Sequence, residues 1–216
     1  IAPAVALENP ARRDVLKQGF ASMVALSSGS LLAGCHSSSS SGGGAASSNI
    51  ENIGPLSATA DANGFFLPAG FSSRIVAKTN IAPLATSTYV WHELPDGGAT
   101  FATSTGGWIY VSNSEADNSL GGVGALEFDA DGNLLDSFQL LSGTSKNCAG
   151  GLTPWNTWLS CEETPTGTVW ETYPLDRGQR VAEQRPALGV FQHEAAAVDP
   201  ASGIVYLTAD QTDGCL

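Results

Sequence analysis

The residues best suited to chemistry are acidic side chains that recur at a fixed interval. Three segments align at a spacing of 48 residues, and each ends in polar or acidic residues: Tyr110–Glu115, Trp158–Glu163 and Tyr206–Gln211. Carboxylates at equivalent positions of a repeat repel one another when they converge, unless they are protonated or bound to cations. The spacing therefore predicts a cation site that includes Glu115 and Glu163. Acids that merely cap strands at the solvent rim are the alternative.

A second set of candidate ligands precedes each of these segments. It comprises His92-Glu93, Cys148 and His193-Glu194. Calcium takes oxygen ligands, so a thiolate among carboxylates indicates a transition metal as well. A structural role for His92 and a disulfide at Cys148 remain alternatives. Cys161 and Cys215 are likewise able to pair, and the sequence does not assign the connectivity.

The elements that position these residues are predicted to be short strands. A period of roughly 40–50 residues is typical of a four-stranded propeller blade. Strands are expected at Val123–Phe128 and Leu134–Leu141, on either side of a turn at Asp129–Asn133, and no long helix is expected after residue 50. The prediction is an all-β β-propeller of which this chain covers about three blades. Equivalent positions of radially arranged blades converge on the central channel.

Composition restricts the class of partner. The formal net charge is −12, and the chain has 25 glycines, which suits many tight turns. Such an acidic chain is not expected to bind nucleic acid, whose phosphates require Lys and Arg. The acidity is compatible with calcium binding, although a role in solubility alone also explains it.

The first 62 residues carry targeting signals. Arg12 and Arg13 form a twin-arginine export signal, and a weakly apolar run after them ends in Leu-Ala-Gly before Cys35. This order predicts export by the twin-arginine machinery, lipidation of Cys35 and a membrane-anchored protein on the periplasmic side of the cell envelope. The expected divisions are a signal segment (1–35), a Ser/Gly-rich tether (36–62) and a propeller portion (63–216).

Several motifs together resemble the PhoX-type alkaline phosphatases. The resemblance runs from about Phe65 to the end of the chain, and its most specific part is Asn147-Cys-Ala-Gly-Gly-Leu-Thr-Pro-Trp-Asn-Thr-Trp-Leu-Ser-Cys-Glu-Glu163. Further matches are Gly107-Trp-Ile-Tyr-Val-Ser-Asn-Ser-Glu115, Gly121-Gly-Val-Gly-Ala-Leu126 and Gly189-Val-Phe-Gln-His-Glu-Ala-Ala-Ala-Val-Asp-Pro200.

The resemblance implies a six-bladed propeller with an iron–calcium cluster in its channel. Cys148 then corresponds to a thiolate iron ligand, Glu163 and Glu194 to carboxylate ligands, and Glu115 with Asn113 to a calcium site. The implied activity is hydrolysis of phosphate monoesters, in which metals bind the phosphate and neutralise developing charge. No serine or histidine nucleophile is then required.

The sequence departs from the family pattern at two positions. Ala209 replaces an acid, and Asn156 stands where glycine is usual. The family's later ligands fall beyond Leu216, so we expect the chain to be part of a longer protein and inactive by itself. Two other functions stay open. One is a non-catalytic calcium-binding envelope propeller, which serves as a scaffold or binding module; the other is a different propeller hydrolase, such as a lactonase.

Overall fold

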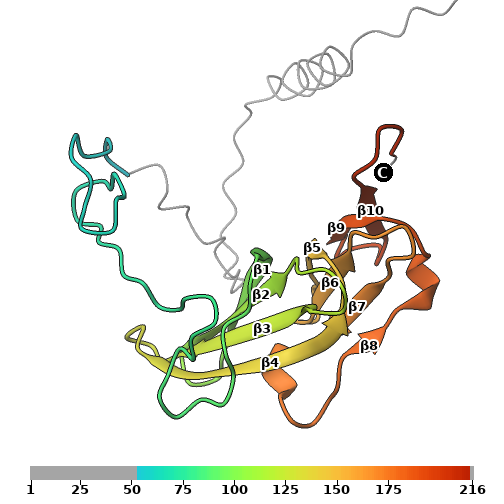
Figure 1. The fold of residues 1–216 in the computed structure, drawn as a ribbon, viewed down its shortest axis with the longest axis horizontal. Coiled ribbons are helices and arrows are strands. Elements are labelled where there is room, and N and C mark those ends of the chain that lie inside the picture. Colours follow the sequence, from blue (N-terminus) through green and yellow to red (C-terminus); the bar gives the residue numbers. More distant parts are fainter. Residues whose placement is uncertain (1–52, 215–216) are drawn as a thin grey trace, which may run out of the picture. The chain divides into compact units, whose positions relative to one another are not determined.

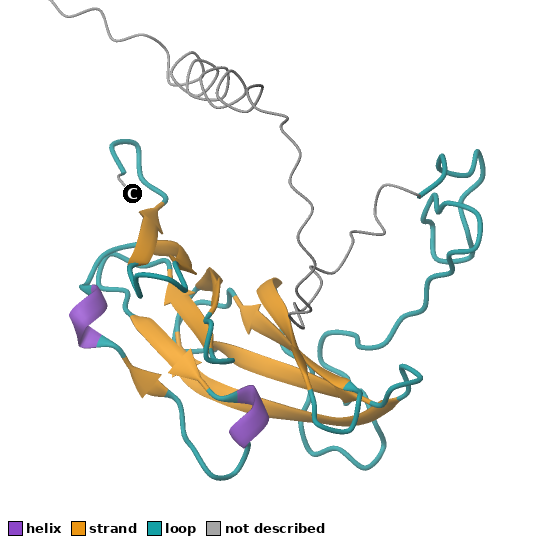
Figure 2. Ribbon diagram, turned by 180° about the vertical axis from the view of Figure 1, so that it is seen from behind, coloured by secondary structure: helices purple, strands orange, loops and turns teal. Residues whose placement is uncertain are grey.

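The computed structural model describes residues 53–214, which form an all-β structure with antiparallel sheets (Figure 1). Two single-turn 3₁₀ helices, η2 (Pro174–Asp176) and η3 (Pro186–Leu188), are the only helices in this part of the chain (Figure 2). The strands are β1 (Pro95–Ala102), β2 (Trp108–Ser114), β3 (Gly121–Phe128), β4 (Leu134–Thr144), β5 (Asn147–Leu152), β6 (Trp158–Glu162), β7 (Val169–Thr172), β8 (Glu183–Gln184), β9 (His193–Val198) and β10 (Val205–Ala209).

The strands form three sheets in chain order. The first has the order β1-β2-β3-β4, the second β5-β6-β7-β8 and the third β9-β10, with every neighbouring pair antiparallel. The all-β prediction is confirmed, as are the strands on either side of the turn at 129–133. In that turn the carboxylate of Asp129 accepts backbone hydrogen bonds from Asp131 and Asn133, a typical use of Asp in turns.

Two apolar layers separate the three sheets. Alternation along β2 sends Ile109 and Val111 toward the second sheet, where they pack with Phe101 and Trp158. The second layer lies between the second and third sheets and contains Leu159, Cys161, Val169 and Ala196. The residues of β6 therefore alternate between the two layers, as expected for a strand buried on both faces.

The opposite face of the first sheet is covered by the segment that precedes β1. Trp91 packs there with Leu126 and Phe128, and Val76 joins the same cluster. The guanidinium carbon of Arg74 lies 6.0 Å from the centre of the Phe128 ring, within cation–π range. This covering leaves only the inner face of the first sheet free to meet the second sheet.

The hairpin turns explain the departure at Asn156. In the turn between β5 and β6, the backbone N–H of Asn156 bonds to the carbonyl of Thr153, and Asn156 has a φ of 63°. Gly106 occupies the corresponding place between β1 and β2, with a φ of 85°. Asn tolerates the left-handed region better than most residues with a side chain, so it substitutes there for glycine.

Several predictions fall outside the described residues. These are the export signal at Arg12 and Arg13, lipidation of Cys35, and any pairing by Cys215. Within 53–214, Cys148 and Cys161 are both free thiols. No helix in the described part of the chain is long and apolar enough to cross a membrane.

Candidate metal centre

The first strand of each sheet contains a bulge at the same level. The strand register shifts between Pro95 and Gly98 in β1 and between Asn147 and Gly150 in β5. In β9 the corresponding shift lies between His193 and Ala196, opposite Ala209 and Leu207. In each case two residues of the first strand face a single residue of the second, and a bulge of this kind re-aims side chains. The first residues of the three bulges are Asp96, Cys148 and Glu194.

The bulges bring five side chains into two groups that share one sulfur. The ligand atoms of Asp96, Glu115 and Cys148 lie within 4.8 Å of one another, and so do those of Cys148, Glu163 and Glu194. We call these the first and second trios. Each contains a bulge residue from two successive sheets and the acid that follows the second strand of the earlier sheet. The two groups thus repeat the same construction.

The acids after the second strands are held by one local arrangement. The backbone N–H of Glu115 donates to the carbonyl of Leu94 at 2.9 Å, and that of Glu163 donates to Lys146 at 2.8 Å. Leu94 and Lys146 directly precede the first strands, and their φ angles are 47° and 49°. Non-glycine residues rarely adopt this conformation, and such strain concentrates at functional sites.

Cys148 is the most crowded of the five ligand candidates. Its Sγ lies 3.4 and 3.5 Å from the two carboxylate oxygens of Glu194 and 3.6 Å from Oδ2 of Asp96. Only 8% of the residue is exposed, while Glu163 and Glu194 are half-buried and Asp96 is exposed. A thiol has one proton and donates it to one acceptor at a time, so only one of these three carboxylate oxygens receives a hydrogen bond from the sulfur at any moment.

The electrostatics of the group disfavour negative charge. Burial, followed by the neighbouring carboxylates of Glu194, Asp96 and Glu163, raises the pKa of the Cys148 thiol above its ordinary value. Burial and the charges of Glu194 and Asp210 also raise the pKa of Glu163, against the smaller opposing effects of a hydrogen bond with Cys148 and of the charge on Lys146. A bound cation reverses this balance, because it favours the thiolate and the carboxylates together.

A sequence profile described as "Alkaline phosphatase PhoX" matches residues 85–216. The chain belongs to the PhoX alkaline phosphatase family. Comparisons with curated proteins and with solved structures returned no match. The PhoX family is metal-dependent, and the sulfur and carboxylate donors of the two trios suit that requirement.

The structure brings together four of the five residues predicted to bind metal in this PhoX-family chain. Cys148, Glu163 and Glu194 make up the second trio, and Glu115 lies in the first. Asn113 lies in neither trio; it is fully buried, and its amide is hydrogen-bonded to the protein at both ends.

The two histidines that precede the repeated segments lie outside both trios. Both ring nitrogens of His92 are hydrogen-bonded, to Tyr89 at 2.8 Å and to Ser112 at 3.1 Å. Burial lowers the pKa of His92 to about 4, so its ring is neutral at physiological pH. The fully buried ring of His193 stacks on Phe191 at 3.6 Å between ring centres. Both rings therefore pack within the protein.

Asp96 is the site residue that the sequence reasoning missed. The repeat alignment matched Cys148 with His92-Glu93, whereas the bulge register matches it with Asp96. The available signal was glycine, because Gly97-Gly98 follows Asp96 much as Ala149-Gly150 follows Cys148. The register also places Asp210, rather than Gln211, level with Glu163, which agrees with the effect of Asp210 on the pKa of Glu163.

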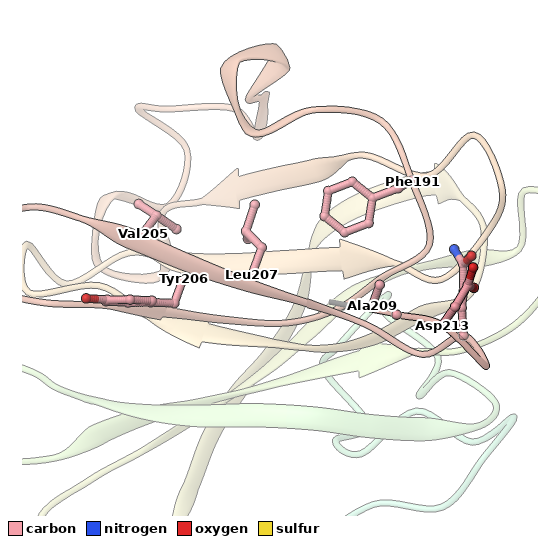
Figure 3. Close-up of a pocket in the computed structure, with 8 residues that line it drawn as sticks. Phe191, Val205, Tyr206, Leu207, Ala209 and Asp213 are labelled. Carbon is pink, nitrogen blue, oxygen red and sulfur yellow. The ribbon is translucent and has the colours of Figure 1, made fainter. Parts of the chain in front are cut away.

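An apolar pocket of about 600 Å³ lies elsewhere, along β10 (Figure 3). Val205, Leu207 and Phe191 line it on one side of the strand, and no residue of the two trios contributes to it. Tyr206 and Ile204 at this strand are about half exposed. Its lining includes a single carboxylate, that of Asp213, and no sulfur, so we assign metal chemistry to the trios.

Proposed function

We propose that this protein is an exported metal-dependent phosphatase that hydrolyses phosphate monoesters at an iron–calcium centre built on the two trios. The observation that carries the proposal is that Cys148 belongs to both trios, each of which adds two carboxylates, in a member of the PhoX family. A cluster of one thiol and four carboxylates is unfavourable without cations and is suited to a hard and a softer metal together.

The donor chemistry of each trio suggests which metal it prefers. Both oxygens of Glu194 approach Cys148 in the second trio, which is the more buried of the two. We assign iron to this trio, because thiolate is a ligand for transition metals. The first trio adds Asp96 and Glu115, of which Asp96 is exposed. Its oxygen donors and access to water suit calcium.

The protein's own residues contribute position and charge. The bulges and the left-handed Leu94 and Lys146 hold the five ligands on the backbones of three sheets. When bound, the metals act as Lewis acids that neutralise the charge developing on the phosphate during its transfer to water. The ammonium of Lys146 is close enough to Glu163 to lower its pKa, so it adds positive charge at the same edge.

The three sheets support the proposal that the fold is a β-propeller. Two four-stranded sheets and one two-stranded sheet stack face to face, and their first strands converge at the bulges. In a propeller, the first strand of each blade lines the channel. A structure of the complete protein is expected to show the trios facing that channel; trios on the outer surface would reject the proposal.

The activity is tested with p-nitrophenyl phosphate and the complete protein, purified with its native metals. We expect turnover that is lost on chelation and restored by iron and calcium, with both metals detected by elemental analysis. Iron and calcium without turnover on phosphate monoesters would reject the phosphatase and favour a scaffold or another hydrolase.

Export and anchoring are proposed from Arg12, Arg13 and Cys35. Replacing both arginines by lysine is expected to retain the protein in the cytoplasm. Cys35→Ser is expected to abolish labelling by radioactive palmitate while leaving export intact. Unchanged labelling in Cys35→Ser would reject lipidation at that residue.

A further inference from the structure

Asn113 lies at the point where the first and second sheets meet beside the metal centre. It is the residue of β2 that faces the bulge of β1, and it is fully buried. Alternation along β2 places its side chain on the same face as Val111, toward the second sheet. It therefore reaches the next sheet's bulge rather than its own.

The amide of Asn113 makes four hydrogen bonds with the second sheet. Its Nδ2 donates to the backbone carbonyls of Cys148 and Ala149, both at 2.7 Å. Its Oδ1 accepts from Nε1 of Trp158 and from Oγ of Ser160, both at 2.9 Å. Carbonyls accept only and an indole N–H donates only, so these partners determine which end of the amide is nitrogen.

The two carbonyls that Asn113 holds belong to the bulge that carries the shared sulfur. A bulge leaves one residue unpaired and disrupts the ladder of backbone hydrogen bonds locally. Cys148 and Ala149 lie inside such a disruption, between the paired residues Asn147 and Gly150. The amide of Asn113 supplies the donors that a regular partner strand would otherwise provide.

We infer that Asn113 is a positioning residue, whose side-chain amide fixes the bulge of β5 and thereby aims the Cys148 sulfur into both trios. It does not act as a ligand, since Nδ2 has no free lone pair and Oδ1 already accepts two hydrogen bonds. The inference rests on the proposed function only in so far as Cys148 binds metal.

The corresponding residues of the other two sheets make no such contact. Cys161 faces the β5 bulge and Thr208 faces the β9 bulge. Oγ1 of Thr208 accepts from the backbone N–H of Ala195 at 3.0 Å, within its own sheet. Of the two sheet junctions in the described residues, only the one beside the thiol-bearing bulge therefore has a side-chain amide that bonds to the next sheet's bulge.

The test compares Asn113→Ala with Asn147→Ala in the complete protein. Asn147 is also fully buried, and its side chain is hydrogen-bonded to Ser160 at 2.9 Å and to Thr144 at 2.6 Å rather than to either carbonyl of the bulge. The first measurement is the rate at which iodoacetamide alkylates Cys148 in metal-free protein, located by peptide mass spectrometry. Thermal melting of both variants corrects for general loss of stability.

Asn113→Ala is expected to speed alkylation of Cys148 by about tenfold more than Asn147→Ala, because the net effect of a lost hydrogen bond approaches a factor of ten. In the holoprotein, Asn113→Ala is expected to weaken iron binding by about 10- to 100-fold, the range typical of residues that orient metal ligands. Trp158→Phe removes one donor to Asn113 and is expected to give a smaller change in both measurements.

Equal alkylation rates in Asn113→Ala and Asn147→Ala at matched stability would overturn the inference. If Asn113→Ala does not fold, the milder Trp158→Phe takes its place. An alkylation rate of Cys148 in Trp158→Phe equal to that of the wild type would then overturn the inference. The alkylation measurement needs no metal. A protein that binds no iron but shows faster alkylation in Asn113→Ala would therefore reject the proposed function and keep the positioning role.

Discussion

The junction between the first and second sheets differs from the junction between the second and third sheets. Both are filled by apolar side chains, around Trp158 in one case and Leu159 in the other. Only the first also contains a buried amide, that of Asn113, which donates hydrogen bonds to backbone carbonyls across the junction. Its counterpart in the second junction is Cys161, a fully buried thiol within the apolar layer. Apolar packing brings sheets together, whereas directional hydrogen bonds determine where a single ligand points.

The largest expected effect on iron binding comes from replacing the thiol of Cys148, with replacement of the Cys161 thiol as the control. Cys148→Ser is expected to remove iron and activity, with a loss of iron affinity beyond the roughly 100-fold seen for residues that only orient ligands. Its circular dichroism is expected to stay close to that of the wild type. Elemental analysis and p-nitrophenyl phosphate turnover check this prediction, and full iron with retained activity would contradict it.

Cys161→Ser is the matched control. It places a hydroxyl in an apolar layer, which is expected to cost about 1–3 kcal/mol of unfolding free energy. Burial raises the pKa of Cys161 to about 12, so its thiol is neutral and behaves as a small apolar group. The iron content is expected to be unchanged. Loss of iron in Cys161→Ser would show that the second junction also positions the centre.

The next prediction separates the metals of the two trios. Glu163→Gln is expected to lower iron affinity at least about tenfold, since it removes a charged donor from the thiolate trio, and to spare calcium. Glu115→Gln is expected to do the reverse. The measurement is the iron-to-calcium ratio of each purified variant. Equal loss of both metals in both variants would mean that the trios act as one indivisible site.

A third prediction uses the glycines at which the sheets approach most closely. A Cβ on Gly97 would lie 2.6 Å from Cα of Ala149, and one on Gly151 would overlap the carbonyl oxygen of Ala196. Gly97→Ala and Gly151→Ala are each expected to cost about 1–3 kcal/mol, as overpacking does. Chemical denaturation measures this cost.

The two glycine variants are expected to differ in iron content. Gly97→Ala presses on the bulge of β5, because after Cα of Ala149 the atom nearest to the new Cβ is the carbonyl oxygen of Cys148, at 3.0 Å. It is therefore expected to reduce iron content, while Gly151→Ala displaces the third sheet. Equal iron content at equal loss of stability would contradict the distinction between the junctions.

The smallest expected effect is at the outer rim of the first junction. Arg177 bonds to Asp136 at 2.6 Å and lies 4.1 Å from the centre of the Phe138 ring. Both charged side chains are more than a third exposed, so Arg177→Ala is expected to cost at most about 1 kcal/mol and to leave metal content unchanged. Thermal melting at low and high salt measures this. A loss of metal would show that the rim also controls the centre.

The sequence predicted the strands better than their irregularities. Alternating residues and the turn at 129–133 predicted β3 and β4, and the recurring acids singled out Glu115 and Glu163, which lie in the first and the second trio. Asp96 was missed because β1 and β2 have eight and seven residues whereas β5 and β6 have six and five, so the distance from the bulge to the repeated segment differs between the sheets. A bulge depends on packing between sheets, and the glycines of the first two bulges are a weak signal because the bulge of β9 contains only Glu194 and Ala195.

The hydrogen-bond partners of the Asn113 side chain could not be predicted from the sequence either. An amide at the end of a strand suits a metal, a water molecule or a carbonyl, and the pattern of β2 does not choose among them. The choice depends on which residues of the second sheet lie opposite. Trp158 and Ser160 are 45 and 47 positions away in the chain.

The repeated bulge fixes where a ligand side chain lies but not which residue type provides it. The same backbone irregularity presents Asp96, Cys148 and Glu194 in turn, so one substitution changes a donor atom without a new fold. The first and second sheets each present two donors in this way, the first residue of the bulge and the acid that follows the second strand.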